Sequence, residues 1–194
     1  MNATRPLPLA VIATFVVLYF ATATAPRANQ SHDHSPAATA ATAAPSIPKS
    51  IQEEHESIHG SLVAATKAPG QVGAAARELA NVLHPHFVRE EQIALPPLGL
   101  LAPLASGAAV SDAAMAQVLP MTDSLRAELP QMLEEHKRIR AAVEKLGAAA
   151  RAEKSESAQR LAEELAAHAR NEEEVLYPAA ILVGDIIRAR QKAK

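Results

Sequence analysis

The chain has 194 residues, a formal net charge of -2 and no cysteine. This length suits one domain with extensions, and the near-neutral charge gives no reason to expect nucleic acid as a partner. The absence of cysteine excludes disulfides, iron–sulfur clusters and zinc–thiolate sites. Because aromatic residues make up only 3%, the core must be built from Leu, Ile, Val and Ala, which suits closely packed helices.

Residues 1–25 are predicted to be an export signal or a membrane anchor. Arg5 precedes the apolar run LPLAVIATFVVLYF, and two overlapping A-x-A sequences follow within 21–25. A basic start, an apolar run and small residues are typical of a secretory signal. The apolar stretch 7–25 also approaches the roughly 20 residues that a membrane-spanning helix needs. Both alternatives place the remaining chain outside the cytoplasm, periplasmic or secreted, either released or anchored through residues 7–25.

Residues 26–49 are rich in Ala, Thr, Pro and Ser, a composition that predicts a disordered linker. His32 and His34 lie in this stretch. We interpret them as polar linker residues rather than as weak metal ligands, because nothing around them is rigid.

From residue 50 onward, apolar residues recur with helical spacing and no strand-like alternation is present. Four amphipathic helices are expected, at about 50–67, 71–95, 123–146 and 155–176. Ser50 and Glu53 form a candidate capping box at the start of the first.

The connections between these helices are predicted as well. Between the second and third helices we expect an apolar loop over 98–107 and a short helix over 111–119. A final helical stretch, 179–191, is expected after a bend at Pro178. Pro85 and Pro130 fall inside predicted helices and should kink them.

Each predicted helix carries an apolar stripe that should face a bundle core. Each stripe is interrupted by a histidine, and two of them also by a glutamate four residues later. The stripe positions are Ile51, His55, Ile58 and Leu62; Leu79, Leu83, His86, Glu90 and Ile93; Leu125, Leu129, Met132, His136, Ile139, Val143 and Leu146; Leu161, Leu165, His168, Glu172 and Val175.

These buried ionisable positions predict a metal site. An isolated carboxylate in a core costs several kcal/mol, roughly, and a cation shared by converging side chains would offset that cost. A single core histidine is usually hydrogen-bonded, and a His–Glu pair is often a surface pair. Both alternatives weaken here because a histidine interrupts every stripe. Side chains four residues apart also stack on one helix face, so His and Glu can reach the same ion.

Imidazole and carboxylate ligands without sulfur suit iron, manganese or zinc, and six ligands exceed the needs of one tetrahedral zinc. If Glu90 and Glu172 bridge two iron ions and each ion takes two histidines, a bridging water or hydroxide leaves about one open position per iron. Oxygen, nitric oxide or peroxide would bind there. We therefore expect two non-haem irons, with zinc or manganese as alternatives. The Glu-x-x-His pattern of ferritin-like di-iron bundles is absent.

Four ordered motifs resemble those of the hemerythrin-like, or HHE cation-binding, family: EEHESIH, HFVREEQIALPPL, EEHKRIR and HARNEEEVLYPAA. The resemblance implies an all-α, antiparallel up-down four-helix bundle over residues 50–192 with a non-haem di-iron centre. The ligands that it implies coincide with the ionisable stripe residues: His55, His86, Glu90, His136, His168 and Glu172.

The chain departs from the oxygen-carrying members of that family at two positions. Arg140 stands where they have a second histidine on the third helix, and they place the last carboxylate where this chain has Glu173. His59 could supply a fifth imidazole, although we favour a half-exposed flanking role. We expect Glu91 and Glu173 to support ligands or to face solvent rather than to bind metal, with Glu173 kept as an alternative ligand.

The expected function is binding or sensing of oxygen, nitric oxide or peroxide, or handling of iron. Two alternatives stay open. The protein could be a di-iron enzyme that turns over peroxide or nitric oxide, or a metal-free helical interaction module.

Overall fold

The computed structural model describes residues 45–193. Within this range the chain is helical, as expected. The predicted export signal and nearly all of the predicted linker lie outside the described residues. No helix among residues 45–193 has the length and apolar character needed to cross a membrane.

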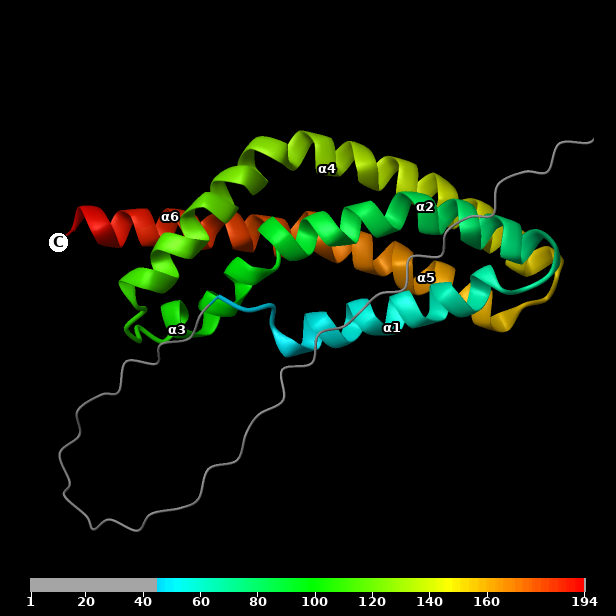
Figure 1. Ribbon diagram of the computed structural model, residues 1–194, viewed down its shortest axis with the longest axis horizontal. Coiled ribbons are helices and arrows are strands. Elements are labelled where there is room, and N and C mark those ends of the chain that lie inside the picture. The colour runs from blue at the N-terminus through cyan, green and yellow to red at the C-terminus, as the bar shows by residue number, and fades with distance from the viewer. Residues whose placement is uncertain (1–44, 194) are drawn as a thin grey trace, which may run out of the picture. The chain divides into compact units, whose positions relative to one another are not determined.

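Four long helical segments pack into a bundle in which successive segments run in opposite directions (Figure 1). The first contacts the second and the fourth, and the third also contacts the second and the fourth, so the four surround a shared interior. The four segments are α1 (Lys49–Thr66), α2 (Gly70–Ile93), α4 (Asp112–Ala152), and α5 (Glu156–Asn171) continued by η2 (Glu172–Leu176) and α6 (Tyr177–Lys192).

The start of the first helix and the connection after the second differ from the expectation. The candidate capping box of Ser50 is wrong, because α1 begins one residue earlier, after Pro48, without a side-chain cap. The expected loop over 98–107 instead contains a 3-10 turn, η1 (Pro96–Leu100), and a short helix, α3 (Leu101–Ala105). This segment is helical because buried Leu100 and Leu104 pack into a core cluster.

The third bundle helix is longer than expected. The short helix predicted at 111–119 and the helix predicted at 123–146 form one 41-residue helix, α4. Ser111 caps its start by accepting a hydrogen bond from the backbone N–H of Ala114. Pro120 and Pro130 lie inside α4, and the helix bends along its length (Figure 1). Each proline removes one backbone donor and bends the helix without ending it.

The fourth segment contains one turn of π-helix, η2. The backbone N–H of Tyr177 bonds to the carbonyl of Glu172, five residues earlier. This wider turn changes which residues face the core. Val175, expected on the apolar stripe, is 52% exposed, whereas Tyr177 is fully buried. The prediction for Val175 is therefore wrong, and its physical reason is the extra residue that a π turn accommodates.

Two apolar clusters fill the bundle interior on either side of a polar layer. On α4, Met132 belongs to one cluster and Ile139 to the other, with buried His136 between them. The same order holds on α2, where His86 and Glu90 are flanked by Leu83 and Ile93. The apolar layers fix the height at which the ionisable side chains meet.

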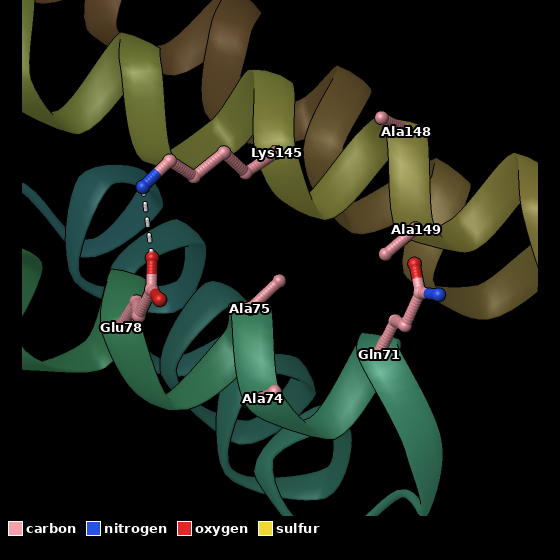
Figure 2. A pocket seen from close by; sticks show the side chains of 7 residues that line it. All are labelled: Gln71, Ala74, Ala75, Glu78, Lys145, Ala148 and Ala149. Atoms are coloured by element: carbon pink, nitrogen blue, oxygen red, sulfur yellow. Dashed lines mark hydrogen bonds and ion pairs between the residues drawn. The ribbon is translucent and has the colours of Figure 1, made fainter.

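A surface groove lies between α2 and α4, near the end of the bundle where α2 begins (Figure 2). Alanines from both helices line it, and the ion pair of Lys145 with Glu78 spans one end at 3.0 Å. Gln71 stands at the other end (Figure 2). None of the ionisable stripe residues lines this groove.

Close approach of α4 and α6 depends on Gly184. A Cβ atom built there would lie 2.3 Å from the hydroxyl and 2.8 Å from the Cβ of buried Thr122. We predict that Gly184→Ala lowers the free energy of unfolding by about 1–3 kcal/mol, because the helices must separate. The measurement is urea denaturation followed by circular dichroism.

Gly60→Ala is the matched control, since nothing lies within 4 Å of a Cβ at this exposed position. This substitution should stabilise the protein by about 0.5–1 kcal/mol, because alanine favours a helix interior over glycine. Equal effects of the two substitutions would contradict the proposed close approach.

Candidate metal centre

Six ionisable side chains from all four bundle segments meet in the polar layer. Each is between 0% and 4% exposed, and they are the six ligands expected from the sequence: His55, His86, Glu90, His136, His168 and Glu172. Within each of the pairs His86–Glu90 and His168–Glu172, the four-residue spacing brings both side chains to one helix face.

The six residues form two overlapping groups that could each hold a metal ion. One contains His55 and His168, the other contains His86 and His136, and both contain Glu90 and Glu172. In each group the candidate ligand atoms lie within 4.8 Å of one another. The two carboxylates are therefore common to both groups.

The two oxygens of Glu172 face different groups. Its Oε1 lies 2.9 Å from Nε2 of His168 and 3.6 Å from Nε2 of His55. Its Oε2 lies 3.4 Å from Nε2 of His136. A carboxylate with one oxygen toward each pair of imidazoles has the orientation of a bridge between two ions.

Several buried polar atoms in this layer have no hydrogen-bond partner. They are both ring nitrogens of His55, Nε2 of His168, Oε2 of Glu90 and Oε1 of Glu172. The 2.9 Å contact of His168 with Glu172 is within ion-pair distance, but its angles do not make a hydrogen bond. Unpaired buried polar atoms are costly, and a cation among these imidazoles and carboxylates would satisfy them. The residues thus fit a metal.

The carboxylates control the charge on the imidazoles when no cation is bound. Burial opposes a charge on His55, but Glu172, Glu91 and Glu90 outweigh it and raise its pKa to about 9. Burial likewise opposes a charge on His86, yet the contacts with Glu90 and a further carboxylate raise its pKa to about 9. Anions in this layer therefore draw in positive charge, as protons when metal is absent.

The two central carboxylates differ from each other. Burial, together with the like charge of Glu172, raises the pKa of Glu90. Burial also disfavours a charge on Glu172, but contacts with His136, His168 and His55 lower its pKa well below the usual range. Glu172 is therefore the charged centre of the imidazole cluster.

A second layer of carboxylates faces the outer nitrogen, Nδ1, of each histidine. Each comes from a neighbouring bundle segment. The pairs are Glu54 with His168 at 3.2 Å, Glu135 with His86 at 2.9 Å, Glu173 with His136 at 2.8 Å, and Glu91 with His55 at 3.8 Å. Such partners fix the ring orientation and direct Nε2 toward the centre, as in carboxylate–histidine–metal sites. The hydrogen bond between Glu173 and His136 agrees with the expected supporting role of Glu173. Glu91 makes no hydrogen bond to His55, and its side chain is 52% exposed.

The sequence interpretation missed Glu54 and Glu135. A signal was present, because each directly precedes a stripe histidine in the repeated tripeptide EEH. It was missed because each glutamate faces the histidine of another helix rather than its own neighbour.

Arg140 lies beside this outer layer rather than in the centre. Its guanidinium contacts Oε1 of Glu173, the same oxygen that accepts from Nδ1 of His136. The residue that replaces a histidine of the oxygen carriers thus supports a carboxylate that orients His136. Neither candidate metal group contains Glu173.

The other histidines of the described residues lie apart from the two groups. His59 and His84 are exposed, and neither belongs to a candidate metal group. The structure thus places His59 on the surface, in agreement with the favoured flanking role.

Tyr177 is a further residue of the centre that the sequence interpretation missed. Its hydroxyl donates to Oε1 of Glu90 and lies 3.3 Å from Nε2 of His86 and 3.2 Å from Nε2 of His136. Its ring stacks on that of His136, with centroids 5.6 Å apart. Helical spacing assigned it no core position, because the π turn that brings it inward has no clear sequence signature.

A cavity of about 370 Å³ between α2 and α4 opens beside the centre. His86 and Glu135 line it, together with Arg89 and Arg138. The cavity lies at the small end of the range for ligand pockets. It gives the His86–Glu135 pair an opening to solvent.

Comparison with known proteins agrees with this geometry. Residues 127–192 match the family model described as the hemerythrin HHE cation-binding domain. This segment is hemerythrin-like. The match includes His136, His168 and Glu172, whereas the remaining residues of the polar layer lie on α1 and α2, outside it. Searches of curated proteins and of solved structures gave no significant match.

The hemerythrin-like match and the two His/Glu groups together indicate a metal-binding protein. The resemblance inferred from the sequence is confirmed over residues 127–192. The assignment of individual ligands on α1 and α2 rests on their convergence with the matched segment.

The metal-free protein should lose stability as pH rises. The folded-state pKa values of His55 and His86 lie near 9, above the value of 6.5 for an unperturbed histidine. Their stabilising contribution is therefore complete below pH 6.5 and is lost as pH rises through 9. We predict that the free energy of unfolding in the presence of a chelator falls by more than about 1 kcal/mol across this window. Urea titrations at both ends would measure it, and a constant free energy would contradict the prediction.

Proposed function

We propose that the protein is a non-haem di-iron protein that binds or senses a small ligand: oxygen, nitric oxide or peroxide. In this proposal Glu90 and Glu172 would donate to both irons. His55 and His168 bind one iron, and His86 and the remaining histidine, His136, bind the other. The observation that carries the proposal is that the same two buried carboxylates belong to both candidate metal groups.

The choice of iron follows from the donor set. Imidazole nitrogen and carboxylate oxygen suit iron, manganese and zinc, and the chain offers no thiolate. Two imidazoles and two carboxylate oxygens give each ion four protein donors. Iron can accept more than four donors, so a small ligand would find room beside these residues. When bound, the iron pair would supply a redox-active site for that ligand.

The surroundings favour a ligand of a few atoms. The polar layer lies between two apolar clusters, and its six residues are at most 4% exposed. A larger substrate would have to displace packed Leu, Ile and Met side chains. The role of the protein is therefore to hold the irons in a fixed, largely enclosed environment, with outer carboxylates orienting the imidazoles.

The location outside the cytoplasm is part of the same proposal. It is supported by the apolar run and A-x-A sequences within residues 1–25. A periplasmic or secreted protein, released or anchored, would meet small diffusible ligands directly.

Iron loading followed by nitric oxide or oxygen tests the function directly. We expect two irons per chain by elemental analysis, visible absorption of a coupled ferric pair after oxidation, and a changed spectrum with nitric oxide. Zinc gives no such absorption. No bound iron after loading would contradict the proposal and favour a metal-free interaction module.

Peroxide separates a binder from an enzyme. A stable spectral change at one peroxide per iron pair supports binding. Continued loss of peroxide over many equivalents supports the alternative, a di-iron enzyme with peroxidase-like activity.

Removal of one ligand should affect metal content and stability together. We predict that His168→Ala lowers iron from two ions per chain to one or fewer. It should also destabilise the metal-free protein by about 3 kcal/mol, because buried Glu172 loses a compensating contact at 2.9 Å. Elemental analysis and urea denaturation measure the two effects.

His84→Ala is the matched control. His84 is exposed and lies in neither metal group, although it is only two residues from His86. This variant should keep both irons. Full iron content in His168→Ala would contradict the ligand assignment.

A further inference from the structure

The two candidate metal groups differ in one respect, the hydroxyl of Tyr177. This side chain is fully buried. Its oxygen lies near three candidate ligand atoms of one group: Nε2 of His86, Nε2 of His136 and Oε1 of Glu90. No contact joins it to His55 or His168.

The unpartnered atoms have the opposite distribution. Nε2 of His55 and Nε2 of His168 have no hydrogen-bond partner, and these two histidines belong only to the other group. Oε1 of Glu172, which also lacks a hydrogen-bond partner, is the oxygen nearest to them. In the group near Tyr177, by contrast, the imidazole Nε2 atoms of His86 and His136 lie 2.8 Å apart and both contact the phenol. The phenol therefore completes one half of the centre only.

The distances from the hydroxyl to the two imidazole nitrogens are those of atoms that share an ion. Ligand atoms about 2.1 Å from a metal lie about 3.0 Å from one another in octahedral sites and about 3.4 Å in tetrahedral sites. The hydroxyl oxygen of Tyr177 lies 3.3 Å from His86 and 3.2 Å from His136. A phenylalanine would fill the same apolar space, so packing alone does not explain a hydroxyl here. Phenolate oxygen is an established type of iron ligand.

The π turn explains how the chain brings this residue to the centre. Glu172 and Tyr177 are five residues apart and joined by a π-type hydrogen bond. In a regular α-helix, residues with this separation point about 140° apart. The wider turn lets both face the core, and π turns often occur at functional sites.

We infer that the phenol oxygen of Tyr177 binds the iron held by His86 and His136, which makes the two irons chemically different. This inference rests on the proposed function. As the iron–oxygen bond forms, the phenol O–H bond breaks and its proton leaves to solvent, with no change in oxidation state. Among the described residues, no phenol lies beside the iron that His55 and His168 would hold.

The test uses the full chain, loaded with ferrous iron and oxidised to the ferric state. A phenolate bound to ferric iron gives a visible charge-transfer band, and resonance Raman excitation in that band enhances tyrosine ring vibrations. We expect both signals in the unaltered protein. In Tyr177→Phe the band and the ring vibrations should be lost while at least one iron remains bound.

The sequence provides a matched control. The chain contains two tyrosines, Tyr19 and Tyr177, so in Tyr19→Phe every tyrosine signal comes from Tyr177. This variant should keep the full band, and ring-deuterated tyrosine should shift its Raman lines. The labelled Tyr19→Phe protein identifies the ligand even where Tyr177→Phe does not fold.

Three outcomes are distinguishable. A band that is present in Tyr19→Phe, with deuterium-sensitive lines, supports the inference. Two bound irons with identical spectra in the unaltered protein and in Tyr177→Phe would overturn it while leaving the proposed function intact. An unaltered protein that binds no iron would overturn the proposed function and this inference with it.

Discussion

The structure depends on how two buried carboxylates are neutralised. Glu90 and Glu172 are 0% and 1% exposed and lie between apolar clusters, where an uncompensated charge is strongly unfavourable. Four imidazoles surround them, and the outer nitrogens of those imidazoles face a second layer of carboxylates. From the bundle axis outward, the two central carboxylates are followed by the four imidazoles and then by the outer carboxylates. Such an arrangement is stable only if positive charge, either protons or metal ions, occupies the imidazole layer.

This constraint connects the fold with its irregular features. Apolar stripes above and below the polar layer set the height at which the four segments meet. The π turn in the fourth segment rotates the chain by one residue, so that Glu172 and Tyr177 both face inward while Val175 faces solvent. Arg140 holds Glu173, which in turn orients His136. Departures from regular helix geometry and from the oxygen-carrier pattern therefore occur around the centre.

The sequence predicted the parts of this molecule that follow regular periodicity. The four helices and the six buried ionisable side chains come from three- and four-residue spacing within single helices, and the hemerythrin-like resemblance comes from four ordered motifs. Contacts between helices could not be predicted from this spacing. Glu54 and Glu135 orient histidines on other segments, which a one-helix pattern does not encode. Tyr177 was missed because a π turn shifts the register by one residue. The helices predicted at 111–119 and 123–146 form one helix, α4, which continues through Pro120.

The central claim is that these buried side chains enclose a pair of cations. Crystals of the iron-loaded protein, measured with anomalous scattering at the iron absorption edge, test it most directly. The account predicts two strong peaks in the polar layer, one beside His55 and His168 and one beside His86 and His136, with both carboxylates between them. A single peak, or peaks confined to exposed side chains, would contradict it.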